Sequence, residues 1–475
     1  MAKTFFFYDL ETSGLSARDD RIMQFAGIRT DENFQQVGEP YNLLVQLNDD
    51  VLPSPDALMV TSITPQKTLD EGYTEAEFCK IITEDVFTPD TCAVGYNNIR
   101  FDDEFVRHIL WRNFYDPYEW SWKDGRSRWD LLDVVRMTRA LRPDGINWPV
   151  VDGKATNRLE LITKENGIAH ENAHDALADV NALIDVTKLI HSKQPQLFDY
   201  LLQMRDKKKV LELVNLDDKK PFVYVSGRYD AAYDKATVAF PLTSGPNGSV
   251  LVYDLRHDPE QFVELDEKVL AKRIFATREE RTAEAFVALP VKTLQYNRCP
   301  AVAPLGVLTQ NDGWKRIRLN EETIERHKKV LLAHPEFAER LRTIYEAKKD
   351  FKKSPDPEAQ LYDGFLGDRD RVRVEAVRNA SVDELADFHP EFSDPRLPEL
   401  LLHYKARSFP RTLSGDEQKK WDDWRAARLQ YQLPGFMKRL TALATGEQPN
   451  DFMIEELRLW TERVLPTEVD QRGDA

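Results

Sequence analysis

Residues 5–14 have the sequence FFFYDLETSG, and the interpretation of the whole chain starts from this stretch. The apolar run predicts a buried strand, and the glycine predicts a turn after it. Residues two apart on a strand share a face, so Asp9 and Glu11 should point the same way from the strand's end. Hard divalent cations such as Mg²⁺ prefer carboxylate oxygens, so a metal is the natural partner for this pair. The alternative is a solvated strand end with two surface acids.

The composition limits the class of protein. A length of 475 residues suggests about three domains. The formal charge of -16 argues against a protein that coats duplex nucleic acid indiscriminately. Cys79, Cys92 and Cys299 lack C-x-x-C spacing, so neither a disulfide framework nor a zinc site is indicated, and a reducing cytosol fits best. No apolar stretch reaches the roughly 18 residues that span a bilayer, so we expect a protein that is neither secreted nor embedded in a membrane.

The first part of the chain predicts a βββαβ order with mixed strand pairing. Residues 22–28 and 41–47 are apolar runs typical of strands. Thr74 with Glu77 three residues later is a capping-box signal for a helix, and residues 91–96 form a further short strand.

Residues 107–142 combine aromatic side chains with an excess of Lys and Arg over Asp and Glu. Unpaired bases stack on aromatic rings while cations follow the phosphates, so this composition suits single-stranded nucleic acid. Trp111 and Phe114 sit at helical spacing and fit a core better. Tyr118 and Trp122 follow a turn and are better candidates for base stacking.

Two further groups of polar residues lie at predicted helix starts. Asp102 and Asp103 are rivals for a functional role, and acids at a helix N-terminus can also serve only as dipole partners. His174 falls in the first turn of a helix expected to start at Asn172, where the positive helix end favours neutral imidazole, a potential base. Asp179 follows five residues later; its rival Asp175 suits capping better.

The later part of the chain changes character from about residue 197. Short apolar segments between Gly and Pro turns predict a small β-barrel, with strands over 222–225, 237–242, 250–255 and 286–291. Helical patterning is expected over 266–275 and 321–349, then a linker over 352–357 and a helical region to the end. The Arg-rich stretches 369–378 and 425–428 are interpreted mainly as solvated helix faces.

Three motifs occur together and in order: Asp9-x-Glu11, Asn98-x-x-Phe101-Asp102 and His174-x-x-x-x-Asp179. This set resembles the DEDDh exonucleases, which have an RNase H-like fold, and the match selects Asp102 over Asp103. The wider chain resembles the bacterial exonuclease I family on stretches 95–98, 100–104, 113–118 and 129–133.

The resemblance implies an α/β fold class with three domains. These are an RNase H-like exonuclease domain with a mixed sheet over 1–193, an SH3-like β-barrel domain over 194–351 and an α-helical C-terminal domain over 352–475. It also implies a cytoplasmic, monomeric enzyme of DNA repair and recombination. Such an enzyme degrades single-stranded DNA processively from 3′ to 5′ into 5′-mononucleotides, and contacts the acidic tail of single-stranded-DNA-binding protein.

The proposed chemistry fits the residues. Asp9, Glu11, Asp102 and Asp179 have the oxygens to hold two Mg²⁺ about 4 Å apart, with Mn²⁺ as a substitute, and His174 would accept the proton of water. Candidate substrate contacts are Glu11, Arg107, Tyr118, Trp122, Arg136, Arg158, Tyr200, Lys292 and Arg298.

Two alternatives remain at this point. One is a proofreading or RNA-trimming exonuclease of the same superfamily, against which the additional length counts. The other is a non-catalytic protein that binds single strands. If the extra domains only enclose the substrate, a fragment ending near Lys193 should retain metal-dependent hydrolysis.

Overall fold

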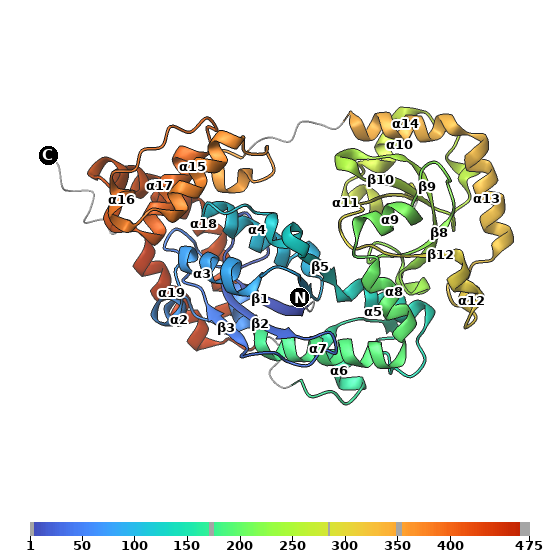
Figure 1. Cartoon of the computed structure of the whole chain (residues 1–475), viewed down its shortest axis with the longest axis horizontal. Helices are drawn as coiled ribbons and strands as arrows, with labels where there is room; N and C mark the ends of the chain where they lie inside the picture. The colour runs from blue at the N-terminus through green and yellow to red at the C-terminus, as the bar shows by residue number, and fades with distance from the viewer. Residues whose placement is uncertain (1–3, 171–174, 284–285, 348–353, 466–475) are drawn as a thin grey trace. The chain divides into compact units, whose positions relative to one another are not determined.

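The computed structural model describes residues 4–170, 175–283, 286–347 and 354–465 (Figure 1). The chain forms two compact units. The first contains residues 1–127, 170–181 and 352–475, and the second contains residues 128–169 and 182–351. Segments from the beginning and the end of the sequence therefore belong to the same unit.

The first sheet has the strand order β3-β2-β1-β4-β5. Its strands are β1 (Thr4–Thr12), β2 (Ile22–Thr30), β3 (Tyr41–Leu44), β4 (Thr91–Gly95) and β5 (Ser127–Asp130). β1 pairs antiparallel with β2 and parallel with β4, which confirms the mixed pairing expected from the sequence. Phe6 and Tyr8 of β1 are fully buried, as the apolar run predicts.

β1 extends beyond its parallel partner at the end that carries the two acids. The register pairs Thr4–Phe7 with Thr91–Val94, so Asp9 and Glu11 lie past the residues paired with β4. Helix α4 (Asp102–Arg112) begins shortly after β4. Because parallel strands end at the same edge of a sheet, the start of α4 lies near the edge where β1 ends.

The helices between β3 and β4 are α1 (Pro55–Thr61), α2 (Pro65–Glu71) and α3 (Glu75–Ile81). Thr74 and Glu77 form the predicted capping box at the start of α3. A π-helical turn, Ile82–Val86, continues from α3. Phe78 and Ile82 are buried in the same core as Phe6 and Tyr8.

The C-terminal helices of the first unit, drawn in orange and red in Figure 1, belong to this unit together with the N-terminal part of the chain. The two parts share hydrophobic cores. They are α15 (Asp368–Asn379), α16 (Val382–Ala386), α17 (Leu397–Ser408), α18 (Gly415–Ala444) and α19 (Asp451–Val464). Trp460 of α19 clusters with Leu47 and Leu58, while Trp111 and Phe114 cluster with Leu400 of α17. Trp111 and Phe114 are therefore core residues, as the sequence suggested.

The second unit contains a five-stranded antiparallel sheet in the order β11-β10-β9-β8-β12. Its strands are β8 (Phe222–Val225), β9 (Ala236–Ser244), β10 (Val250–Asp254), β11 (Val291–Leu294) and β12 (Ala301–Pro304). The strand predicted over 286–291 is wrong, because β11 starts only at Val291. Pro290 has no N–H to donate to a ladder, so the strand begins after it.

The remaining elements are α5 (Leu131–Leu141), β6 (Val150–Val151), β7 (Lys154–Ala155), α6 (Leu159–Glu165), α7 (Ala176–Lys193), α8 (Pro195–Gln203), α9 (Lys207–Leu213), α10 (Glu267–Ile274), α11 (Arg278–Thr282), α12 (Gly313–Arg316), α13 (Glu321–Ala333) and α14 (Pro335–Glu346). The single helix predicted over 321–349 is therefore two helices. Pro335 disfavours helical backbone at the residue before it, and it starts α14 at the position that proline tolerates.

Among the residues described, no helix is both long and apolar enough to cross a membrane.

Candidate active site

Three carboxylates from distant parts of the sequence meet at the end of β1. One oxygen each of Asp9, Glu11 and Asp179 lies within 4.8 Å of the other two. Asp9 and Glu11 come from β1 and share a face, as the two-residue period requires. Asp179 comes from the first turns of α7, where Asp175 accepts a 3.1 Å hydrogen bond from the N–H of Leu177. Asp175 thus has a capping role, as the sequence suggested, but it precedes the helix, which begins at Ala176 and not at the expected Asn172.

Asp102 and Asp103 have different surroundings, and these separate the two rivals. Asp103 accepts hydrogen bonds from the hydroxyl of Tyr8 at 2.5 Å and from the side-chain amide of Asn98 at 3.2 Å. Its carboxylate is therefore bonded to two buried side chains of the protein. The charge of Asp102 contributes to the raised pKa of Asp9, which places Asp102 near the carboxylate cluster. Asp102 is not one of the three residues whose oxygens lie within 4.8 Å of one another, so its assignment as the fourth member stays a prediction, which its effect on Asp9 supports.

The pKa values of Asp9 and Glu11 indicate that the cluster is suited to binding a cation. Burial, followed by the charges of Asp102 and Asp179, raises the pKa of Asp9 well above its usual range. Burial, followed by the charges of Asp9, Asp179 and Asp175, raises the pKa of Glu11 to about 9. Without a cation these carboxyl groups tend to stay protonated, because ionisation would place buried negative charges close together. A set of hard oxygen donors that is unfavourable when ionised fits a divalent metal ion.

His170 contacts the cluster, and our sequence interpretation did not identify it. Its Nε2 lies 2.6 Å from Oδ1 of Asp179, and its side chain is almost fully buried. A second histidine four residues before His174 was the signal available in the sequence. His174 lies outside the described residues, so its role as a base stays a prediction.

Besides Glu11, the predicted substrate contacts of the first unit are Arg107, Tyr118 and Trp122, and they differ in accessibility. Trp122 is 63% exposed. The guanidinium of Arg107 bonds Glu104 at 3.0 Å and lies 5.5 Å from the centre of the Tyr118 ring. Arg107 is thus occupied by protein partners and only 10% of its side chain is exposed. Its predicted phosphate contact gains no support from this geometry.

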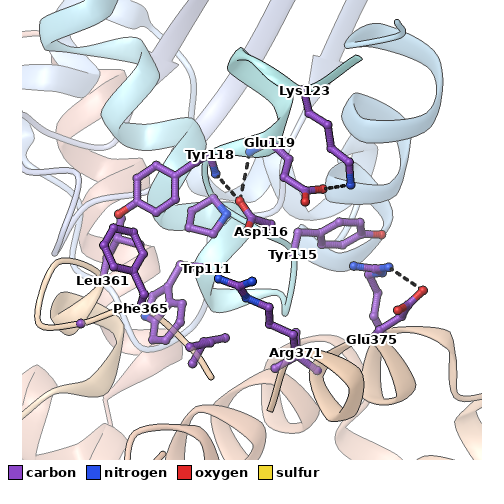
Figure 2. A pocket seen from close by; sticks show the side chains of 15 residues that line it. Trp111, Tyr115, Asp116, Tyr118, Glu119, Lys123, Leu361, Phe365, Arg371 and Glu375 are labelled. Atoms are coloured by element: carbon purple, nitrogen blue, oxygen red, sulfur yellow. Dashed lines mark hydrogen bonds and ion pairs between the residues drawn. The ribbon is translucent and has the colours of Figure 1, made fainter. Parts of the chain in front are cut away.

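Tyr118 lines a cavity of about 270 Å³ between residues 111–123 and 361–378. Figure 2 shows the rings of Trp111, Tyr115, Tyr118 and Phe365 around it. Phe365 is 83% exposed and its ring centre lies 6.1 Å from that of Tyr118. Phe365 was not predicted from the sequence, because it follows a linker and has no helical or strand periodicity around it.

The predicted contacts of the second unit are likewise unequal. Arg136 is ion-paired with Asp133 at 2.6 Å. Lys292 sits 3.6 Å from the centre of the Tyr229 ring, and burial lowers its pKa to about 8.

The other three residues predicted in that unit are Arg158, Tyr200 and Arg298. Arg158 is ion-paired with Glu160, but 66% of its side chain is exposed. Tyr200 packs partly buried against the core of the second sheet, and Arg298 is exposed. Among the five predicted contacts of this unit, Arg158 and Arg298 are thus the exposed cations. All five assignments stay predictions.

Comparison with known protein families assigns each part of the chain. Residues 6–187 match the family model "Exonuclease", residues 205–347 match "Exonuclease I SH3-like domain", and residues 355–464 match "Exonuclease I C-terminal domain". These matches confirm the expected fold class, an RNase H-like exonuclease domain followed by SH3-like and helical parts.

Individual relatives match over nearly the whole chain. Exodeoxyribonuclease I of Escherichia coli (strain K12) is 42% identical over 421 residues, which is 88% of each protein. Its crystal structure with a dA16 oligonucleotide matches with a TM-score of 0.93 and 39% identity, covering 98% of this chain and 100% of that one. The moderately thermophilic exonuclease I of Methylocaldum szegediense gives the same values.

Two further solved structures bear on ligands of these relatives. One is a zinc-bound E. coli exonuclease I complex with single-stranded DNA, at 38% identity, TM-score 0.92 and coverage of 97% and 99%. The other is an SSB/exonuclease I structure with the inhibitor CFAM, at 38% identity, TM-score 0.89 and coverage of 98% and 100%. With three family models in order and identity above a third along the chain, this protein belongs to the exonuclease I family of exodeoxyribonucleases.

Proposed function

We propose that this chain degrades single-stranded DNA from its 3′ end, releases 5′-mononucleotides processively, and acts in DNA repair and recombination as a cytoplasmic monomer. The observation that carries the proposal is the meeting of Asp9, Glu11 and Asp179 within 4.8 Å at the end of β1. The relatives that match over most of the chain are exodeoxyribonucleases, and one is solved with a DNA oligonucleotide.

The cofactor we propose is Mg²⁺, as two ions, with Mn²⁺ able to replace it. Asp9, Glu11, Asp102 and Asp179 would hold it, since all four offer hard carboxylate oxygens. When bound, the metal supplies charge neutralisation and stabilises the phosphate oxygens during displacement. The raised pKa values of Asp9 and Glu11 support a cation at this position, because it replaces the protons that these acids otherwise favour.

The protein's own groups orient the substrate and move the proton. His174 would accept the proton of the attacking water, and His170 holds one oxygen of Asp179. Tyr118, Trp122 and Phe365 would stack bases, since aromatic faces bind unpaired bases with little sequence preference. Exposed cations such as Arg158 and Arg298 would contact phosphates.

A protein partner is also proposed. The acidic tail of single-stranded-DNA-binding protein is the expected ligand, and the solved SSB/exonuclease I structure supports this pairing. Contact with that protein would bring the enzyme to exposed single strands.

The test is digestion of DNA and RNA strands of identical sequence, labelled at either end, with Mg²⁺ or with EDTA. We expect the 5′-labelled DNA strand to shorten stepwise and the 3′-labelled strand to release labelled mononucleotide at once. Equal rates on RNA would favour the trimming alternative, and binding without cleavage would favour the non-catalytic one.

The matched variants lie on one helix. Asp179→Asn should lower turnover by at least about 10³-fold, since metal-centred stabilisation contributes several kcal/mol. Asp185→Asn on α7 removes a half-exposed carboxylate that pairs with Lys188, and it should leave the rate unchanged. Near-normal turnover of Asp179→Asn would refute its assignment as a ligand.

A further inference from the structure

Six charged side chains are buried together inside the first unit. They are Arg21, Asp50, Glu75, Arg112, Glu358 and Arg407, and each side chain is at most 3% exposed. Three are cations and three are anions, so the six charges balance. Four come from the N-terminal part of the chain and two from residues 354–465. Buried ions need partners, because the interior does not hydrate them.

Glu358 lies within 4 Å of all three arginines of this group. Its Oε2 lies 3.0 Å from Nη2 of Arg21 and 3.9 Å from Nε of Arg112. Its Oε1 lies 2.5 Å from Arg407 and 2.9 Å from Nδ1 of His403. One carboxylate thus joins Arg21, the residue before β2, to groups from α4 and α17.

The same region offers a second set of ligand-type atoms, but a metal is not indicated there. Asp356, Glu358 and His403 have atoms within 4.8 Å of one another. Arg428 bonds Asp356 at 2.9 Å, and Arg407 bonds Glu358. Guanidinium groups already neutralise both carboxylates, so this is an ion-pair network.

Arg21 connects Glu358 to the strand that carries two of the catalytic acids. The N–H of Ser13 donates to the carbonyl of Arg21, and the N–H of Arg21 donates to the hydroxyl of Ser13, both at 2.8 Å. Ser13 follows Glu11 by two residues. The Arg21 backbone is therefore bonded to the first residue after β1, whose last residues also pair with β2.

Residues 357–362 also hold α4, which begins with Asp102. The indole N–H of Trp111 donates to the carbonyl of Pro357 at 3.0 Å. The hydroxyl of Tyr362 donates to Glu104, two residues after Asp102. The segment therefore contacts both ends of the helix.

We propose that residues 357–362 position the catalytic carboxylates. Glu358 holds β1 through Arg21 and holds α4 through Arg112. Tyr362 holds the start of α4 through Glu104. Glu358 is a positioning residue and does not touch substrate or metal. The inference rests on the proposed metal site, and it makes the C-terminal part of the chain a requirement for cation binding.

The experiment measures Mn²⁺ binding to the full-length protein without DNA, from the electron paramagnetic resonance signal of free Mn²⁺. Glu358→Gln should weaken binding by about 10-fold, the lower end of the range for groups bonded directly to metal ligands, because Glu358 acts on the ligands through Arg21 and Arg112. Glu358→Asp, which keeps the charge, should restore part of the affinity. Asp179→Asn tests the site itself: if its affinity equals that of the wild type, the proposed metal site is wrong.

The matched control is Lys405→Met. Lys405 is 1% exposed and bonds Glu417 at 2.9 Å, a pair within the C-terminal helices that includes none of the six clustered charges. It should lower thermal stability yet leave Mn²⁺ affinity unchanged. Equal weakening by Lys405→Met and Glu358→Gln would overturn the proposal, as would wild-type affinity of Glu358→Gln.

A second variant serves if Glu358→Gln does not fold. Tyr362→Phe removes only the hydroxyl that bonds Glu104 and Arg107, and the residue is 46% exposed. Several-fold weaker Mn²⁺ binding by this folded variant supports positioning by the segment. Unchanged affinity would overturn it.

Discussion

Removing divalent cations should make the folded protein less stable as the pH rises, and Glu11→Gln should remove much of this dependence. Burial, followed by the charges of Asp9, Asp179 and Asp175, raises the pKa of Glu11 from 4.5 to about 9. In this interval the folded protein keeps a proton that the unfolded chain releases. Stability is therefore complete below the unfolded pKa and is lost as the pH rises toward the folded pKa.

The size of the effect follows from the width of that interval. One group loses about 1.4 kcal/mol of folding stability per pH unit within it. Between about pH 6 and about pH 8.5 the loss is then roughly 3 kcal/mol from Glu11, with water penetration reducing it. For domains of this size such a change lowers the melting temperature by about 5–10 °C. Asp9, whose pKa is also raised, acts in the same direction.

The assay is thermal unfolding followed by circular dichroism at both pH values, in EDTA and in Mg²⁺. Bound Mg²⁺ replaces the proton, so its stabilising effect should be larger at the higher pH. Glu11→Gln should flatten the dependence in EDTA, whereas Asp185→Asn should leave it unchanged. If Glu11→Gln and the wild type lose the same stability in EDTA, Glu11 does not hold the proton and the electrostatic argument fails.

The remaining predictions concern the base, the aromatic rings and the chain length. His174→Ala should retain Mn²⁺ and DNA binding but turn over roughly 10² to 10⁴-fold more slowly, with a flattened acidic limb in its pH–rate profile; a wild-type rate and limb would place the base elsewhere. Tyr118→Ala and Trp122→Ala should each weaken single-strand binding by about 1–3 kcal/mol with an unchanged salt slope; lower thermal stability without a selective binding loss would indicate core packing. A fragment ending at Lys193 should unfold at lower temperature and lose Mn²⁺ binding, contrary to the expectation from sequence, and a folded fragment with normal Mn²⁺ affinity would contradict this.

The parts of the site that the sequence predicts are those set by local geometry. The alternation of a strand places Asp9 and Glu11 on one face, and this holds in the structure. The capping box at Thr74 and Glu77 likewise depends on residues three apart. Choosing Asp102 over Asp103 needed the family motif, because both residues begin the same helix. The structure distinguishes them because Tyr8 and Asn98 donate hydrogen bonds to Asp103.

Two element boundaries were predicted wrongly because they were set by the apolar pattern and not by the prolines within it. Pro335 divides the predicted helix 321–349, and Pro290 delays the predicted strand 286–291. Both prolines are visible in the sequence, and their missing N–H groups and restricted neighbours predict the breaks.

The buried ion cluster was not predictable from local patterns. Arg21 and Glu358 are 337 residues apart, and neither lies in a motif. Arg428 belongs to a stretch expected to be a solvated helix face, yet only 11% of its side chain is exposed and it bonds Asp356. Periodicity separates inward from outward positions, but it does not identify which distant charge completes a pair.

The separation of Arg21 and Glu358 has a consequence for the timing of activity during protein synthesis. A ribosome adds about 5–20 residues per second, so roughly 17 to 67 s pass between the two residues. Through that interval the nascent chain carries its catalytic acids without the carboxylate that we propose fixes them. A nuclease built in this way would become competent only after its C-terminal helices have emerged and folded, so unfinished chains would not degrade DNA.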